Sequence, residues 1–216
     1  MRTFSVFLTL IFAILLGNSA LAQDAKATEV LKASEAKFNG MADFAANFKY
    51  SLQNPTAKSG GASKQGKIKY KKGKFRVEMT DQDLYCDKHK LWVYIKADKE
   101  VNVTPYDGSD GLDIETIFKS YKQNAKARYE GEKTVNGIAC HEIFIASTDK
   151  KSDYNQVRLW INTKTNFLEK AELSDRRQVK TIYEFSNVKA NNGFSDNEFR
   201  FDVAKNPGVK VYDETN

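Results

Sequence analysis

The sequence is poor in the residues that most enzyme and metal chemistry requires. It contains two histidines, two cysteines and three prolines among 216 residues. It has no Gly-x-Ser-x-Gly nucleophile elbow, no His-Glu-x-x-His pair and no phosphate-binding glycine loop. We therefore predict that the protein is not an enzyme and uses no cofactor. A pair of catalytic carboxylates stays open as the enzymatic alternative, because a sequence does not show how far apart two such groups lie.

The two cysteines are too few for a disulfide framework. Cys86 lies near His89, and Cys140 precedes His141. Zinc ligands are usually spaced by two to four residues, whereas adjacent residues of a strand point to opposite faces. We therefore predict two buried free thiols and no metal site. A single disulfide stays open, since an exported protein permits one.

The charge balance is only modestly basic. Lysine and arginine number 34 against 28 acidic residues, which gives a formal charge of +6, and the lysines are spread along the chain. Lys67, Lys69 and Lys71 alternate with apolar residues, as on the solvent face of a strand. We therefore predict no nucleic-acid partner, although the basic excess could favour anionic membranes or acidic proteins.

The first 22 residues have the pattern of a cleavable signal peptide. Arg2 precedes an apolar run from Phe4 to Leu16, and Ala20-Leu21-Ala22 fits a small-x-small cleavage site. The run is shorter than the roughly 20 apolar residues that a membrane-spanning helix needs. We expect residues 1–22 to be removed and residues 23–216 to form one exported domain.

Alternation dominates the rest of the chain. Between Gly66 and Val101, apolar and polar residues alternate along several short segments separated by polar turns, a pattern typical of consecutive antiparallel strands. The Leu91–Ile95 segment is apolar on both faces. The Asn136-Gly137 pair predicts a tight hairpin. Some ten strands predict a mainly β (α+β) fold built on one curved antiparallel sheet, because wide sheets curl or close.

Two segments change to the helical period. Asp24–Phe38 reads as an amphipathic helix that ends at Asn39-Gly40, and Asp113–Tyr121 reads as a second, shorter one. A helix this short must dock its apolar face to be stable. We expect both helices to cover the concave face of the sheet, the second as a lid.

An ordered series of motifs resembles the LolA family of periplasmic lipoprotein carriers. It comprises Gly-x-Ile-x-Tyr-Lys-Lys-Gly-Lys-Phe-Arg-Val-Glu from Gly66, then Asp87, Leu91-Trp92-x-Tyr94 and the C-terminal Pro207-Gly208-Val209-x-Val211-x-Asp213. The resemblance implies an incomplete β-barrel, closed by helices around a hydrophobic cavity for lipoprotein acyl chains. It implies a monomer in the periplasm that takes cargo from an inner-membrane ABC transporter and passes it to an outer-membrane receptor.

The predicted site follows from the resemblance and from the aromatic content of the strands. The acyl-chain cavity is predicted to contain Phe48, Tyr50, Phe75, Val77, Trp92, Tyr94, Phe144, Leu159 and Tyr183. The predicted lid consists of Val30, Leu31, Phe38, Ile114, Ile117, Phe118 and Tyr121. Lys72 stands where the family has an arginine that holds the lid, and the neighbouring proline is missing. Lysine keeps the charge but lacks the planar fork of arginine.

A second interpretation keeps the fold and changes the role. The protein would be a periplasmic sensor that binds lipoprotein or lipid and signals to a membrane partner. Sensors of this kind are generally longer and carry a second domain.

Overall fold

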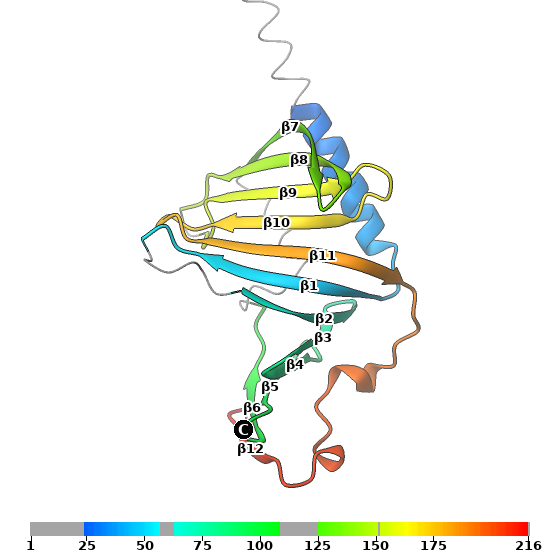
Figure 1. Ribbon diagram of the computed structural model, residues 1–216, viewed down its shortest axis with the longest axis vertical. Helices are drawn as coiled ribbons and strands as arrows, with labels where there is room; N and C mark the ends of the chain where they lie inside the picture. The colour runs from blue at the N-terminus through cyan, green and yellow to red at the C-terminus, as the bar shows by residue number, and fades with distance from the viewer. Residues whose placement is uncertain (1–23, 57–62, 109–124, 151, 216) are drawn as a thin grey trace, which may run out of the picture.

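The computed structural model describes residues 24–56, 63–108, 125–150 and 152–215. Within these ranges the chain forms one helix over residues 24–39 and one twelve-stranded sheet, which curves strongly without closing into a barrel (Figure 1). The strands are β1 (Phe44–Gln53), β2 (Ser63–Lys71), β3 (Lys74–Met79), β4 (Gln82–Cys86), β5 (Lys90–Ile95), β6 (Glu100–Pro105), β7 (Ala125–Val135), β8 (Ile138–Ser147), β9 (Gln156–Asn162), β10 (Leu168–Ser174), β11 (Lys180–Ala190) and β12 (Lys210–Asp213). The predicted fold class is confirmed.

Two antiparallel meanders meet at β1. The spatial order is β12-β6-β5-β4-β3-β2-β1-β11-β10-β9-β8-β7. The pairing of β1 with both β2 and β11 joins a meander of β2–β6 to one of β7–β11. At the far edge, β12 runs parallel to β6. Strands from the beginning and the end of the described chain therefore lie side by side.

Tight turns set the register of two hairpins. Lys72-Gly73 joins β2 to β3, and Asn136-Gly137 joins β7 to β8. All four residues have positive φ, between 47° and 82°. Two successive left-handed residues give the turn whose twist matches that of paired strands. The hairpin predicted at Asn136-Gly137 is confirmed.

Gly66 allows an unusually close approach between β2 and its neighbours. A Cβ at this position would lie 2.0 Å from the Glu78 carbonyl oxygen of β3 and 3.0 Å from the ring of Phe48 on β1. Any other residue would have to displace backbone atoms. The glycine therefore lets the Phe48 ring lie across β2.

The helix predicted from Asp24 is confirmed and packs against one face of the sheet. Ala27, Val30 and Leu31 are almost fully buried in the main apolar cluster. The helix ends at Gly40, whose N–H donates to the Ala36 carbonyl at 2.9 Å. In Figure 1 it lies behind the upper strands. We call this side of the sheet the covered face and the other side the outer face.

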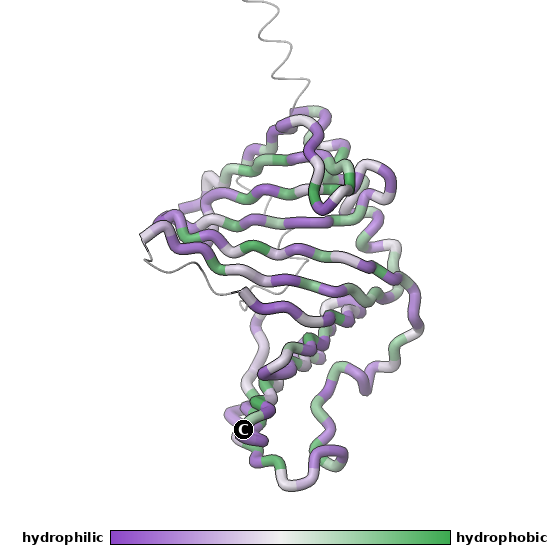
Figure 2. Tube along the Cα trace, in the orientation of Figure 1, coloured by the Kyte–Doolittle hydropathy of each residue, from purple (hydrophilic) through white to green (hydrophobic). Residues whose placement is uncertain are grey.

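Along each strand, successive side chains point alternately to the covered face and to the outer face. Figure 2 shows the accompanying alternation of hydrophobic and hydrophilic residues. The main apolar cluster contains residues from the helix and from β1–β5 and β7–β11 on the covered face. A second cluster lies on the outer face. It consists of Tyr85, Val101, Val103 and Phe201, with Trp92, Tyr94 and Val209 packed against it.

The C-terminal segment, residues 191–209, connects β11 to β12 and supplies part of this second cluster; we call it the C-terminal arm. It contains the 3-10 turns η1 (Asp196–Phe199) and η2 (Val203–Lys205). Asp43 holds its start, since the carboxylate accepts from the backbone N–H groups of Asn192, Gly193 and Phe194 at 2.6–3.0 Å. Further along, Arg200 pairs with Asp87 at 2.9 Å.

Cys86 and Cys140 are both buried and free. This agrees with the preferred prediction and settles the disulfide alternative in this structure. The predicted signal peptide, residues 1–22, and the predicted lid helix, residues 113–121, lie outside the described residues.

Candidate functional site

The covered face presents a continuous apolar surface across both meanders. Strand alternation and register place on it Phe44, Phe48 and Tyr50 of β1, Ile68 of β2, Phe75 and Val77 of β3, Leu84 of β4, Leu91 and Val93 of β5, Ile143 and Ile145 of β8, Val157 and Leu159 of β9, Ala171 and Leu173 of β10, and Tyr183 and Phe185 of β11. This surface is the strongest candidate site because apolar residues of both meanders and of the helix converge on it.

The helix covers one end of this surface with an aromatic group. The Phe38 ring lies 6.0 Å from that of Phe44 and 5.1 Å from that of Tyr70. The ring centroid of Phe167 lies 5.8 Å from that of Phe44 and 6.3 Å from that of Phe185. Tilted and edge-on rings at these separations are favourable beyond their buried area. This end is closed by packed aromatic side chains.

Elsewhere on the covered face some apolar side chains are partly accessible, and we call these residues the open region. Tyr50, Met79, Leu84 and Val93 pack against the main cluster but stay partly accessible. Leu52, at the end of β1, is 36% exposed. Burying such surface is favourable by about 25 cal/mol per Å². The open region is therefore the part of the covered face where further burial of apolar surface would be favourable.

Three tyrosines introduce hydroxyl groups on the covered face. The rings of Tyr50 and Tyr183, which face each other across β1 and β11, lie 5.5 Å apart. Tyr154 packs against the same cluster, and its hydroxyl bonds to the Thr181 side chain. Burial raises the pKa of both Tyr154 and Tyr183. These two phenols therefore remain neutral hydrogen-bonding groups at physiological pH.

The structure brings six of the nine predicted cavity residues to the covered face: Phe48, Tyr50, Phe75, Val77, Leu159 and Tyr183. Of the predicted lid residues, Val30, Leu31 and Phe38 lie on the helix and contact the same cluster. Ile114, Ile117, Phe118 and Tyr121 lie outside the described residues.

Trp92, Tyr94 and Phe144 are not brought to this face, and their predicted place in the cavity is corrected. Trp92 and Tyr94 pack into the second cluster, where the Tyr94 ring lies 5.0 Å from that of Phe201. The C-terminal arm explains why the Leu91–Ile95 strand is apolar on both faces. Phe144 points outward with Arg158, whose guanidinium lies 5.0 Å from the ring centroid.

Lys72 occupies the first position of the β2–β3 turn with φ 47°. Gly73 beside it donates its N–H to the Tyr70 hydroxyl at 2.8 Å. The turn conformation therefore places Lys72 at the tip of the β2–β3 hairpin. Its predicted latch role toward residues 113–121 stays a prediction.

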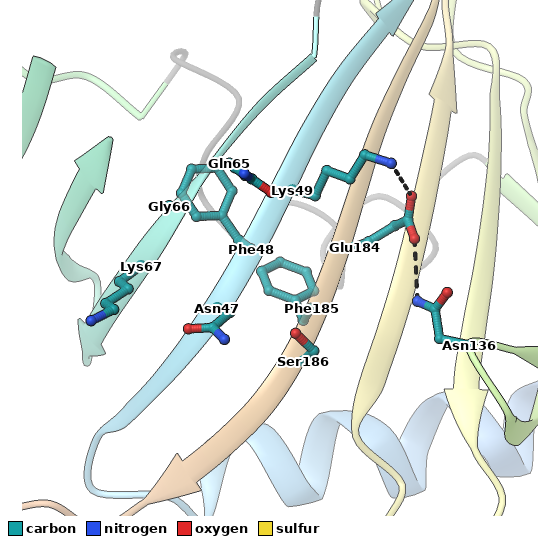
Figure 3. Close-up of a pocket in the computed structure, with 10 residues that line it drawn as sticks. All are labelled: Asn47, Phe48, Lys49, Gln65, Gly66, Lys67, Asn136, Glu184, Phe185 and Ser186. Carbon is teal, nitrogen blue, oxygen red and sulfur yellow. Dashed lines mark hydrogen bonds and ion pairs between the residues drawn. The ribbon is translucent and has the colours of Figure 1, made fainter. Parts of the chain in front are cut away.

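Two grooves on the sheet have linings that combine polar and apolar side chains. One, of about 520 Å³, runs over β1, β2 and β11 and includes Asn47, Lys49, Lys67 and Glu184 in its lining (Figure 3). Glu184 contacts Lys49 at 3.8 Å and Asn136 at 3.3 Å. The other, of about 490 Å³, lies near the end of the helix and includes Lys37 and Glu169. Phe48 and Phe185 also line the first groove, and Met41, Phe167 and Phe185 also line the second.

Metal-ligating groups are dispersed in the part of the chain that the structure describes, where no three His, Cys, Asp or Glu side chains gather. Burial raises the pKa of the Cys140 thiol to about 11. A thiol with that pKa is a poor nucleophile and a poor metal ligand at neutral pH.

Several site residues were missed by the sequence analysis. Met79, Leu84 and Val93 follow from strand parity, since each pairs with a residue of the neighbouring strand that lies on the same face. Tyr154 lies between β8 and β9 and has no periodicity that could reveal it. The position of that loop is set by tertiary contacts.

The sequence model of one protein family, described as "Outer membrane lipoprotein carrier protein LolA", matches residues 39–202. No curated protein matches the sequence significantly.

Solved structures share the fold at low sequence identity. An uncharacterized conserved protein from Thermus thermophilus is 12% identical, with a TM-score of 0.57, over 88% of this chain and 99% of that one. MucB is 15% identical with a TM-score of 0.52, over 82% of this chain and 63% of that one. The lipoprotein LppX of Mycobacterium tuberculosis is 10% identical with a TM-score of 0.50, over 80% and 98%.

In the described ranges, no helix is both long and apolar enough to span a membrane.

Proposed function

Because the chain belongs to the LolA family of outer membrane lipoprotein carrier proteins, we propose that it binds the acyl chains of lipoproteins and carries them between membranes. The observation that supports this most directly is the open region of the covered face. There Leu52, Met79 and Leu84 leave apolar surface accessible on the inner side of a curved sheet. The folded domain gains no stability from leaving that surface accessible, whereas a ligand would gain from covering it.

The energetics of a carrier fit such a surface. Transfer of each acyl methylene out of water is favourable by about 0.8 kcal/mol. Exposing a chain of about ten methylenes to water therefore costs roughly 8 kcal/mol of free energy. A site that offers partly exposed side chains can offset much of this and still release its cargo. In our proposal the helix residues Val30, Leu31 and Phe38 form one wall of the lid.

The proposal includes the cell biology that the sequence predicts. Residues 1–22 act as a signal peptide, residues 23–216 form one periplasmic domain, and the mature protein is a monomer. An inner-membrane ABC transporter supplies the lipoprotein, and an outer-membrane receptor accepts it. The family consists of carrier and binding proteins, and we propose no catalytic step.

Charge placed in the open region tests the proposal. We expect Leu84→Glu to abolish lipoprotein release from inner-membrane vesicles, because a carboxylate would meet the acyl chains. Val211→Glu is the matched control, since Val211 is 45% exposed on the edge strand β12, outside the main cluster. Unchanged release with Leu84→Glu, in a variant that keeps its circular dichroism spectrum, would contradict the proposal.

The sensor interpretation predicts a different bound partner. After purification without detergent, mass spectrometry of a carrier finds acylated lipoprotein. A sensor instead co-purifies with a membrane signalling protein. The match to MucB covers 63% of that protein, so the shared fold leaves part of MucB without a counterpart. The bound partner distinguishes the two roles.

A further inference from the structure

The groove near the end of the helix lies where the sheet loses one of its strands; we call it the helix-end groove. Strand β11 extends to Ala190, but its last pair with β10 is Glu184 with Lys170. On its other side, β11 stays paired with β1 as far as Ala190. Figure 1 shows the end of β11 continuing beyond the start of β10. Among the described residues, the segment 185–190 therefore has a strand neighbour on one side only.

The backbone of this segment offers hydrogen-bonding groups on its unpaired side. The Asn191 N–H donates to the Asp43 carbonyl on the β1 side at 2.8 Å. Successive residues of a strand direct their backbone groups to alternate sides, so the N–H and C=O of Ala190 point away from β1. Asn187 has φ 53° where the register with β1 shifts, and such a bulge leaves an extra residue unpaired. An unpaired strand edge is a template for a further strand.

The groove follows this edge. It has a volume of about 490 Å³, and its lining combines the unpaired segment of β11 with the turn between β9 and β10. Asn187 and Ala190 line it and are exposed. Buried Met41, Phe167 and Phe185 add apolar surface. An edge of this length accommodates a strand of about five or six residues.

A buried carboxylate gives the groove a negative charge. Glu169 lines it and is 7% exposed, and the Asn162 amide donates to its carboxylate at 2.8 Å. Glu142 is equally buried and pairs with Arg158 at 2.7 Å, whereas Glu169 forms no ion pair with any residue that the structure describes. A buried charge is costly unless it is paired, and a carboxylate can accept from several donors. A cation in the groove would therefore satisfy Glu169.

We propose that the helix-end groove binds an extended segment of a partner protein that carries a lysine or an arginine. The backbone of the segment adds as a strand to the unpaired edge of β11, and its basic side chain pairs with Glu169. Lys37 also lines the groove and can donate to a backbone carbonyl of the segment. The groove shares no residue with the open region. The inference therefore goes beyond the proposed function and does not depend on acyl binding.

A set of terminally blocked hexapeptides of threonine and valine tests the groove. The third position of each peptide is lysine, arginine, norleucine or glutamate. We expect the lysine and arginine peptides to bind most tightly and the glutamate peptide most weakly, measured by fluorescence polarisation of the labelled peptides. Hydrogen exchange at the Ala190 amide should slow in the complex, because that N–H gains a partner.

Glu169→Gln removes the charge and keeps the size of the side chain. We expect it to weaken the lysine peptide by about 10- to 100-fold, as for the loss of a hydrogen bond to a charged group, and to leave the norleucine peptide unchanged. Glu142→Gln is the matched control, because Glu142 is as buried as Glu169 but already pairs with Arg158. Ala190→Pro removes the edge N–H and should abolish binding of every peptide.

Circular dichroism spectra establish that each variant folds. If Ala190→Pro does not fold, exchange at Ala190 in the wild type tests strand addition instead. Absence of binding by both basic peptides, or a lysine preference that survives Glu169→Gln, would overturn the proposal. Binding that leaves exchange at Ala190 unchanged would also overturn it. Acyl binding is tested separately by Leu84→Glu, so the two proposals fail independently.

Discussion

Among single residues, Asp43 connects the first strand to the C-terminal arm. It is 3% exposed and accepts three backbone N–H bonds at the start of the arm. Burial tends to raise its pKa, but the N–H groups of Asn192, Phe194 and Gly193 outweigh burial and hold the pKa below 3.8. The stability that it contributes is therefore present above its unfolded pKa of about 3.9 and is lost as the pH falls through the lower folded value.

We predict that Asp43→Asn lowers the free energy of unfolding by about 1–3 kcal/mol at pH 7, because one acceptor is replaced by a donor. The difference from the wild type should shrink below about pH 4, where the contribution of the ionised carboxylate is progressively lost. Urea unfolding at several pH values between 7 and the acid limit of the folded state measures this change. A difference that does not depend on pH would show that the charge of Asp43 is unimportant.

Among the elements, the C-terminal arm covers the outer face of β4–β6. The ring centroid of Phe201 lies 5.6 Å from that of Tyr85 and 5.0 Å from that of Tyr94. The neighbouring residue Arg200 forms an ion pair with Asp87. Lys71 and Lys74 both pair with Asp196. Surface ion pairs contribute little individually, so the buried rings of Phe199 and Phe201 should carry most of the stability of the arm.

We predict that Phe201→Ala costs about 3–5 kcal/mol of stability, as expected for a large aromatic removed from a packed cluster. Phe201→Leu should cost much less, because it conserves most of the volume. Acyl-chain binding, measured where both variants stay folded, should be unchanged, since the arm lies on the outer face. Loss of binding in step with stability would mean that the two faces are coupled.

For the molecule as a whole, acyl binding and folding stability should be linked. A ligand at 100 times its Kd stabilises the native state by about 2.7 kcal/mol. For a domain of this size that corresponds to a rise in Tm of roughly 5–10 °C. We expect this rise with dipalmitoylglycerol for the wild type and for Val211→Glu, followed by differential scanning fluorimetry. Leu84→Glu should show none.

The local elements could be predicted from the sequence alone. Period-two alternation predicted the strands, Asn136-Gly137 predicted its hairpin and helical spacing predicted the helix from Asp24, because each depends on neighbours in the chain. The LolA motifs correctly indicated the family, and three residues predicted for the cavity, Phe48, Phe75 and Leu159, lie on one face of the sheet.

The assignment of apolar residues to one face or the other required tertiary contacts. Alternation divides a strand into two sets but does not say which set meets the helix, so Trp92 and Phe144 were assigned to the wrong face. Trp92 and Tyr94 are covered on the outer face by the C-terminal arm, which comes much later in the chain. Tyr154 packs against the main cluster only because separate strands converge, and no local pattern encodes that position.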